Sequence, residues 1–581
     1  MASSADVFFD PRNLHLLPQD IQTTADCALK GSIAHLERMV AFAKRNASNA
    51  DLTELLLPVC WANLDTSVIP KEADLNTTVP YTLPRAPLLA LSLSCHIHYK
   101  RPEAGADLWT RVWPWACFID EMRDIVVGCP SALDMARLVF TSMPTDPEVI
   151  VNLLPAFRIY LMKAWNSFLQ SQDPDTPGFW PLLLFLSPGE DDPSRPSFLA
   201  EYVQGAGGSV HHLARLVYEH VALACRTGND PHLIAGLNFV LSIPISFDNG
   251  FHEALGDRGI VRILCRLANM LTPGSGAVPP LLLVLMVLRR LLGPDRRVRQ
   301  ALRHHLLDAL LRLATLNISD DNVEILRAIL ARVQLGTLSY SVLSVLQGVL
   351  SSAEDFAASQ TLRHLHNQWN QFISSTYARL AVKNIIDSPE YVPHSACDYI
   401  RCRKIQQKKD LKACGDCRSA RYCNIQCQRS DWRFHRLHCE TLQGEQRETL
   451  RGRERSFVRA IVKRTYETNQ TDILVGMLTE AGPKNLDQPM SLIHDYRTTT
   501  DRATLKFSID GPGSFYQVQR AQRDRKIHTH LVYIPGHNTC QLLMRSETDL
   551  TDILTTVHKI MDEEEIAARD ALTRFRSVVI H

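Results

Sequence analysis

The sequence has almost no excess of charge of either sign and no long apolar run. Its 63 basic and 62 acidic residues leave a formal net charge of +1, so no global imbalance points to nucleic acid or to a membrane surface. The longest apolar run covers residues 277–288, whereas a membrane-spanning helix needs about 20 residues. We therefore expect no membrane association and interpret this run as a buried helix.

Export and lipidation signals are also missing. The first residues, Met-Ala-Ser-Ser-Ala-Asp, have neither the basic start nor the apolar run of a secretory signal peptide, and no glycine follows the initial methionine. A reducing compartment, in which thiols stay reduced, fits this sequence best. We expect an intracellular protein, in the nucleus or the cytoplasm.

Catalytic motifs are equally scarce. The sequence contains no phosphate-binding loop, dinucleotide fingerprint or nucleophile elbow. His211-His212 and Glu219-His220 do not match the H-E-x-x-H metalloprotease pattern, and we expect them on a solvated helix face. His304-His305 with Asp308 is expected to be a surface pair of the same kind. The sequence therefore predicts that the protein is not an enzyme.

What the sequence does contain, up to about residue 390, is a 3.6-residue apolar period. Ile33, Leu36, Met39 and Val40 form one such stripe. Further helices are expected at residues 52–61, 86–99, 106–126, 131–142, 147–170, 209–225, 231–242, 259–271, 279–292, 297–315, 321–334, 339–351 and 355–385. We predict a mainly α protein, with a loosely structured arm at 1–30 and a helical array at 31–390, either armadillo/HEAT-like or an irregular bundle. Such an array usually acts as a scaffold.

Three tryptophans, Trp109, Trp113 and Trp115, lie close together in one predicted helix. We interpret them as a packing hub, and an aromatic groove for a partner peptide is the alternative.

The pattern changes near the C-terminus. Residues 441 to about 466 are charged and helical, whereas Leu505, Phe507 and Ile509 alternate with polar residues as in a half-buried strand. Further strands are expected at 515–518, 530–534 and 541–544, and a final helix at 549–575. We predict that 441–581 forms a helix plus a small α+β domain.

Between these parts lies a cysteine cluster. Seven of the 15 cysteines fall within residues 397–439. Together with one histidine they form four closely spaced pairs, which are Cys397/Cys402, Cys414/Cys417, Cys423/Cys427 and His435/Cys439. Eight thiol and imidazole donors are enough for two tetrahedral zinc ions.

Two sites are favoured over one. If the last two pairs lie on a continuous helix, Cys423 and His435 are separated by roughly 18 Å along its axis, too far to share one metal. The segment also has few apolar residues, and a domain of about 40 residues usually needs a metal or disulfide to fold. We therefore expect two structural Zn²⁺ ions, each closed by pairs from different parts of the segment.

This pattern of pairs, together with Arg421-Tyr422 before Cys423, Gln428 and Trp432, resembles a MYND-type zinc finger at residues 397–439. The resemblance implies a cross-brace. In it, Cys397, Cys402, Cys423 and Cys427 hold one zinc, and Cys414, Cys417, His435 and Cys439 hold the other. The spacing of the first pair is longer than the commoner two-residue spacing.

Closed zinc sites carry out no chemistry, because a catalytic zinc keeps a position open for water. The resemblance instead implies a protein-interaction module that docks short peptides, including proline-containing ones, and a role in transcriptional regulation. Gln428 and Trp432 match positions that line the peptide groove, although Trp432 could alternatively fill the core of the finger. Nucleic acid is the less favoured partner, because with its thiolates and metal ions the finger carries a charge of only about +4.

The alternative function is an enzyme of unrecognised type, carried by the helical or the C-terminal domain. Some MYND proteins are SET methyltransferases, but the Asn-His-Ser-Cys segment and the glycine-rich cofactor strand that such an enzyme needs are not found.

Overall fold

The structure is a computed structural model of the 581-residue chain. It describes residues 7–70, 81–82, 84–97, 102–123, 126–127, 130–141, 157–171, 195–228, 230–271, 278–293, 295–316, 318–359, 362, 364–402, 404–440, 443, 452–470, 472–473, 476, 491–496, 504–508, 527–533, 540–545 and 579–580.

The chain divides into two compact units. The first contains Met1–Ile263 and Gly276–Val287, and the second contains Leu264–Ser275 and Leu288–His581. Helices α16 (Ile260–Met270) and α17 (Val278–Leu291) each contribute to both units. The predicted boundaries near residues 30, 390 and 440 stay a prediction.

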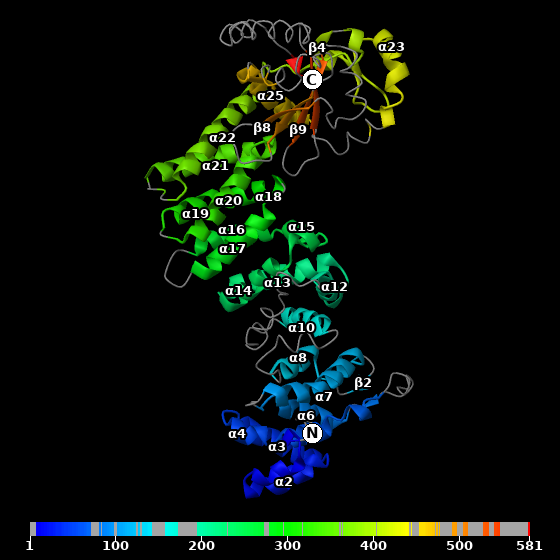
Figure 1. Ribbon diagram of the computed structural model, residues 1–581, viewed down its shortest axis with the longest axis vertical. Helices are drawn as coiled ribbons and strands as arrows, with labels where there is room; N and C mark the ends of the chain where they lie inside the picture. Colours follow the sequence, from blue (N-terminus) through cyan, green and yellow to red (C-terminus); the bar gives the residue numbers. More distant parts are fainter. Residues whose placement is uncertain are drawn as a thin grey trace. The chain divides into compact units, whose positions relative to one another are not determined.

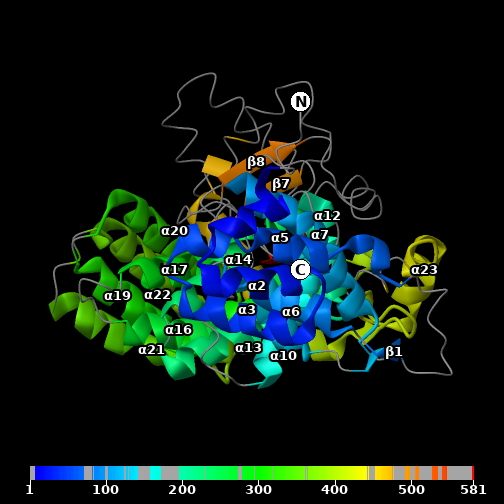
Figure 2. The same cartoon turned by 90° about the horizontal axis from the view of Figure 1, so that it is seen from below.

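The first unit is built from helices that pack against their near neighbours in the sequence. For example, α3 packs against α2 and α6, α10 against α12, and α13 against α14 and α15 (Figures 1 and 2). The elements are η1 (Pro11–Leu16), α2 (Gln19–Leu29), α3 (Ile33–Arg45), α4 (Ala50–Glu54), α5 (Leu57–Asn63), η2 (Thr66–Val68), α6 (Arg85–Ser94), α7 (Pro102–Glu121), α8 (Ala132–Thr141), α10 (Phe157–Ser171), α12 (Arg195–Gly205), α13 (Val210–Thr227), α14 (Asp230–Ser242), η4 (Ile245–Phe247) and α15 (Phe251–Asp257). Two short strands, β1 (Tyr81–Thr82) and β2 (Val126–Val127), pair in parallel.

The N-terminal segment differs from the expected loose arm. Within it, η1 and α2 are helical, Leu14 and Ala28 are fully buried, and α2 packs against α3 and α5. The two prolines that suggested an irregular arm occupy helix starts, Pro11 in the first turn of η1 and Pro18 at the N-cap of α2. Proline is compatible with these positions because the first N–H groups of a helix have no intrahelical acceptor.

The three tryptophans of α7 form the expected packing hub. Trp109, Trp113 and Trp115 are all buried, and the helix continues through Pro114. The ring of Trp113 lies 5.3 Å from that of Phe157 and 5.5 Å from that of Tyr160, both on α10. These aromatic contacts join α7 to α10, so the tryptophans serve the core.

His220 was expected on a solvated face, and this expectation is wrong. The side chain is buried in α13, accepts a hydrogen bond from Trp165 Nε1 at 3.1 Å and contacts the carbonyl of His232 through Nε2 at 2.7 Å. Gly236 on α14 makes this burial feasible, because a Cβ there would lie 2.7 Å from Cδ2 of His220. The neighbouring His211 and His212 are exposed as expected.

The second unit continues with α18 (Asp295–Arg303), α19 (Leu306–Ala314), α20 (Asp320–Gly336), α21 (Tyr340–Ser359) and α22 (His366–Asp387), and α25 (Gly452–Thr468) follows the cysteine-rich segment. Helix α21 packs against α18, α19 and α22, and α25 packs against α21 and α22 (Figure 1). The cysteine-rich segment is therefore inserted between two helices that contact each other.

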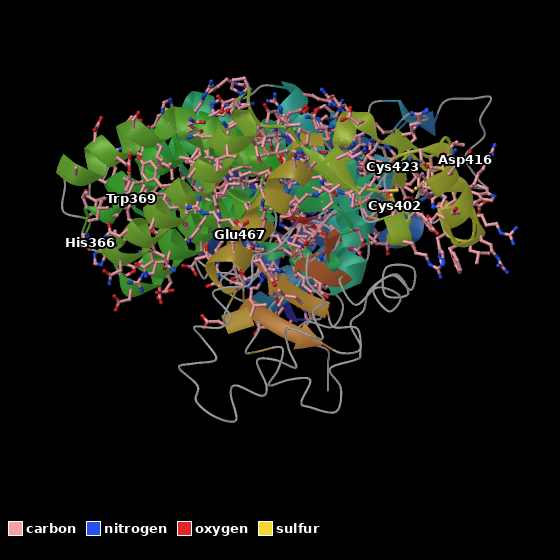
Figure 3. All side chains as sticks on the ribbon, turned by 90° about the horizontal axis from the view of Figure 1, so that it is seen from above. His366, Trp369, Cys402, Asp416, Cys423 and Glu467 are labelled. Carbon is pink, nitrogen blue, oxygen red and sulfur yellow. The ribbon has the colours of Figure 1, made fainter. Side chains whose placement is uncertain are left out.

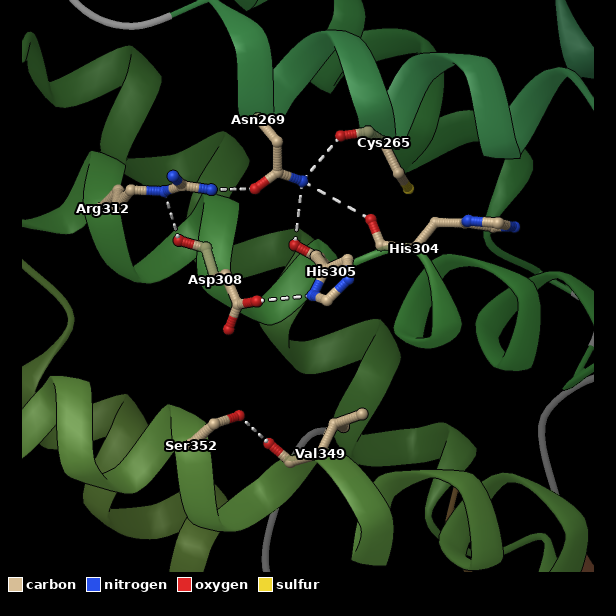
Figure 4. Close-up of polar contacts among 8 residues, drawn as sticks. All are labelled: Cys265, Asn269, His304, His305, Asp308, Arg312, Val349 and Ser352. Atoms are coloured by element: carbon tan, nitrogen blue, oxygen red, sulfur yellow. Dashed lines mark hydrogen bonds and ion pairs between the residues drawn. The ribbon is translucent and has the colours of Figure 1, made fainter.

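The turn between α18 and α19 is held by Asn269 (Figure 4). Its Nδ2 donates to the carbonyls of Cys265 at 2.8 Å and His305 at 3.1 Å, and its Oδ1 accepts from Arg312. His305 adopts the left-handed conformation, with φ of 63°, and its Nδ1 pairs with Asp308 at 2.8 Å on the surface. A histidine–aspartate surface pair is thus present, formed by His305 at i, i+3 to Asp308.

A five-stranded sheet follows α25. Its strands are β7 (Ser491–Asp495), β8 (Thr504–Ser508), β9 (Ile527–Tyr533), β10 (Cys540–Arg545) and β11 (Val579–Ile580), in the order β11-β10-β9-β7-β8. The β7–β9 pair is parallel and the other pairs are antiparallel. The small C-terminal α+β domain is confirmed, whereas the strand expected at 515–518 and the helix expected at 549–575 lie outside the described residues.

The predicted mainly α fold class is confirmed, and residues 278–288 of the apolar run belong to α17, where Val284, Val287 and Leu288 are fully buried. Within the part of the chain that the structure describes, no single helix has the length and apolar character of a membrane span. One bent pair, Asp320–Gly336 with Tyr340–Ala358, meets those two criteria only when its helices are taken together.

Candidate metal centre

The segment from residue 394 to 439 is a pair of small hairpins followed by a helix. Strands β3 (His394–Ala396) and β4 (Ile405–Gln407) form the first hairpin, with η5 (Ile400–Cys402) in its loop. After η6 (Lys408–Asp410), strands β5 (Lys412–Ala413) and β6 (Arg421–Tyr422) form the second. Helix α23 (Ile425–His435) then begins at Asn424, whose side chain accepts from the backbone N–H of Cys427 at 2.8 Å. Each hairpin loop presents one cysteine pair, and α23 presents donors one turn apart.

The first cluster joins the first hairpin to the start of α23. It contains Cys397, Cys402, Cys423 and Cys427, whose sulfur atoms lie within 4.8 Å of one another. The Sγ of Cys423 is 3.4 Å from that of Cys402 and 3.5 Å from that of Cys427. Figure 3 labels Cys402 and Cys423, which come from different hairpins and meet at this cluster.

The second cluster joins the second hairpin to the end of α23. Cys414, Cys417, His435 and Cys439 are all buried and their donor atoms also lie within 4.8 Å of one another. His435 Nε2 is 3.3 Å from the Sγ of Cys414 and 3.5 Å from that of Cys417, and the sulfurs of Cys414 and Cys439 are 3.9 Å apart. The structure therefore brings the eight predicted residues together in the two interleaved groups that the resemblance implied.

These distances fit zinc. Around a metal with bonds of about 2.3 Å to sulfur, tetrahedral donors lie about 3.7 Å apart, close to the separations of 3.3–3.9 Å in both clusters. None of the seven cysteines of the two clusters forms a disulfide. Two sets of four thiol or imidazole donors match two structural zinc ions with closed coordination, and such ions would link the hairpins to α23.

The donor residues also form the interior of this segment. Among the described residues, Cys397, Cys414, Cys417 and Cys439 are buried in one cluster with Ala420 and Tyr422. Burial raises the pKa of Cys397 to about 12 and that of Cys439 to about 12. A buried thiolate is stable only beside a cation. Metal binding would therefore stabilise the ionised form of these thiols, which is the form that acts as a ligand.

A second layer of contacts positions His435, and the sequence analysis missed it. The hydroxyl of Tyr422 donates to the buried carboxylate of Asp431 at 2.8 Å, and the ring of Tyr422 meets the edge of the His435 ring. Cys427, Asp431 and His435 are four residues apart along α23 and so share its inner face. The i, i+4, i+8 spacing was the available signal for this face, with Asp431 at its centre.

Arg418, in the loop of the second hairpin, is another residue whose role the sequence did not indicate. Its φ is 56°, and its N–H donates to the carbonyl of Cys414 at 3.1 Å. A non-glycine residue in this region is uncommon, so no composition signal marked the turn that brings Cys414 and Cys417 together.

The outer surface of α23 carries the two predicted peptide-binding residues. Trp432 is 42% exposed, so its ring lies only partly within the finger. Gln428 lies one turn before it and is half-buried. The Trp432 ring also contacts the His435 ring, with centroids 5.9 Å apart, so the second cluster supports its position.

Comparison with known proteins agrees with this geometry. The family model of the MYND finger matches residues 397–439, and this segment is a MYND finger. N-lysine methyltransferase SMYD2-A of Danio rerio is 35% identical over 107 residues, 17% of this chain and 23% of that protein. N-lysine methyltransferase SMYD2 of Homo sapiens is 41% identical over 46 residues, 8% of this chain and 10% of that protein.

Histone-lysine N-methyltransferase ASHR1 of Arabidopsis thaliana is 30% identical over 82 residues, 14% of this chain and 17% of that protein. The chain thus spans less than a quarter of the length of these curated relatives. No solved structure matches the chain. MYND fingers are protein-interaction modules, so the chain carries a zinc-binding interaction module between its helical and α+β parts.

Proposed function

We propose that the protein is a zinc-dependent interaction scaffold whose finger docks short peptides, including proline-containing ones, in transcriptional regulation. In this proposal the eight residues of the two clusters are the zinc ligands. One observation carries it: a large indole, Trp432, stays 42% exposed on a helix that closed donor clusters hold at both ends. Tryptophan is enriched among the residues that contribute most to binding energy at protein interfaces.

The neighbouring Gln428 completes the proposed peptide site. It precedes Trp432 by one turn of α23, so the two side chains project from one side of the helix. The amide of Gln428 can hydrogen-bond a peptide backbone, and the indole can pack against a proline ring. The indole of Trp432 contacts the ring of His435 in the second cluster, so zinc would act by pre-organising this surface.

The test compares Trp432→Ala with Phe434→Ala, a matched control because Phe434 is 40% exposed on the same helix but points to another side. We expect Trp432→Ala to weaken binding of proline-containing peptides by at least about tenfold, a typical hot-spot loss. Phe434→Ala should retain binding, and both variants should keep two zinc ions by elemental analysis. Equal loss in both variants, or none in either, would contradict the proposed site.

The names of the relatives favour a second candidate, a lysine methyltransferase, although the matches cover small parts of those proteins. In this candidate the helical or α+β domain would carry the active site. The full chain, loaded with zinc, should be incubated with a labelled methyl donor and lysine-rich protein substrates. Methyl transfer above background would contradict the scaffold proposal and support an enzyme. Peptide binding without methyl transfer would support the scaffold proposal.

A further inference from the structure

The outer face of α23 carries a stripe of positive charge around Trp432. Arg429, Arg433 and Arg436 are all exposed, and we call these three residues the arginine stripe. Relative to Arg429, residues Trp432, Arg433 and Arg436 occupy positions i+3, i+4 and i+7, which share one face of a helix. Ile425, 46% exposed, precedes Arg429 by one further turn.

Within the residues that the structure describes, the arginine stripe has no ion-pair partner. The exposed Glu440 follows Arg436 by four residues but forms no ion pair with it among the described residues, and Asp431 lies on the inner face of α23, buried and bonded to Tyr422. Asp398 is likewise engaged, because its carboxylate accepts from the backbone N–H of Arg421 at 2.5 Å. Arg429 and Arg433 are like charges at i, i+4 on α23, and a carboxylate bound between them would offset their repulsion.

We propose that this face binds acidic peptides, in which aspartate or glutamate residues flank an apolar core. The inference rests on the proposed docking function and specifies the chemistry of the partner. Trp432 and Ile425 would contact the apolar core, and the arginine stripe would pair with the flanking carboxylates. The planar guanidinium of arginine matches a carboxylate through two parallel hydrogen bonds.

An acidic peptide fits this face better than nucleic acid does. The stripe offers three cations, two on α23 and one at its C-cap, and the exposed apolar side chains of Ile425 and Trp432 lie beside them. Nucleic-acid binding depends on many phosphate contacts, whereas a hydrated phosphate backbone gains nothing from Ile425 or Leu437, which are 46% and 69% exposed. Protein interfaces typically have an apolar centre surrounded by a polar rim, and charged side chains next to apolar ones fit this arrangement.

The experiment uses the full chain loaded with zinc and three fluorescent peptides that share a Pro-Leu-Pro core. The core is flanked on both sides by Glu-Glu, by Gly-Ser or by Lys-Lys. We expect affinity to fall in that order. In about 0.05 M salt, the glutamate peptide should bind about tenfold more tightly than the neutral peptide. In about 0.5 M salt this difference should be much smaller, because screening weakens exposed ion pairs. Fluorescence anisotropy measures all three affinities.

Charge reversal then locates the effect. The double variant Arg429→Glu/Arg433→Glu should reverse the order of the charged peptides, while its zinc content stays at two ions. Lys409→Glu/Lys412→Glu is the matched control, because it changes the net charge of the finger equally at exposed positions in η6 and β5. The control should keep the order seen with the unaltered chain.

The outcomes separate this inference from the proposed function. Equal affinities for the three peptides would overturn the acidic preference and leave proline-peptide docking intact. Binding of a glutamate-rich peptide without prolines would support the acidic surface and contradict a need for proline. Loss of the acidic preference in the control variant as well as in the stripe variant would overturn the assignment to α23. Tighter binding of a single-stranded oligonucleotide than of the glutamate peptide, through the stripe, would also overturn it.

Discussion

At the scale of single residues, His220 and His232 are buried neutral side chains within the first unit. Burial lowers the pKa of His220 to about 3 and that of His232 to about 4. The Nδ1 atom of His220 accepts from Trp165, so this ring is bonded as a neutral imidazole. Protonation would add a charge to a site that is almost completely removed from solvent.

Acid should therefore destabilise the first unit. The folded-state pKa values lie below the unfolded value of about 6.5, so the unfolded chain binds more protons once the pH falls under that value. The stability is complete above pH of about 6.5 and decreases by up to about 1.4 kcal/mol per pH unit for each histidine as the pH falls toward the folded pKa. Thermal unfolding at several pH values measures this slope.

The variant His220→Gln removes one titrating group and should flatten the slope, although it also lowers stability at neutral pH. His211→Gln, at an exposed position on the same helix, is the control and should leave the slope unchanged. A slope that is the same in both variants would show that His220 is not the buried group responsible.

Residue spacing alone predicted the metal donors of the finger but not the burial of His220. The reason is that donor pairing depends on local spacing, whereas burial depends on distant residues. Pairs such as Cys423/Cys427 are local, so the helix period brings their sulfurs together whatever surrounds them. The burial of His220 depends on Gly236, which lies on another helix and admits the ring only because it has no side chain. No local pattern around position 220 contains that information.

At the scale of elements, α25 follows the finger in the sequence and packs against α21 and α22, which precede the finger. The carboxylate of Glu454 on α25 accepts from the N–H of Tyr340 at 2.7 Å, the N–H of Ser341 at 2.9 Å and the hydroxyl of Ser339 at 3.1 Å. These donors surround the start of α21, where free N–H groups and the helix dipole favour a negative charge. The finger therefore begins and ends on one packed group of helices.

Replacing Glu454 should loosen this attachment. We expect Glu454→Ala to cost about 1–2 kcal/mol, because it leaves partly buried N–H groups without their charged acceptor. Glu467→Ala is the control, since Glu467 lies on the same helix and only pairs with Lys463 at 3.7 Å on the surface. Hydrogen exchange at residues 340–343 and thermal unfolding report the effect, and equal behaviour of the two variants would contradict the capping role of Glu454.

Most elements could be expected from apolar periodicity, because amphipathic helices such as α3 and α13 carry their burial pattern in the sequence. The N-terminal helices could not, because prolines mark both helix starts and chain breaks. For the sheet, the sequence predicted individual strands but not how they pair. Its order and the parallel β7–β9 pair join strands more than 30 residues apart, a relation that alternation within one strand does not encode.

At the scale of the whole molecule, two different kinds of core occur in one chain. The helical units bury large apolar side chains, including Trp115 and Trp165 in the first unit and Phe372 in the second. The finger buries mainly its own metal donors. The helices can therefore fold by apolar burial, whereas the finger depends on zinc for most of its folding free energy.

Removing zinc should consequently unfold the finger alone. With a strong chelator, we expect far-UV circular dichroism to change little, because the finger contributes one helix of 11 residues to a mainly helical chain. Limited proteolysis should gain new cleavage sites between residues 397 and 439, and peptide binding should disappear. The variant Cys423→Ser should behave like the chelated protein, whereas Cys265→Ser, a buried cysteine outside the finger, should retain zinc and peptide binding. Cooperative loss of the whole helical signal on chelation would show instead that the metal centre stabilises the helices, and the division into apolar and metal-dependent cores would then be wrong.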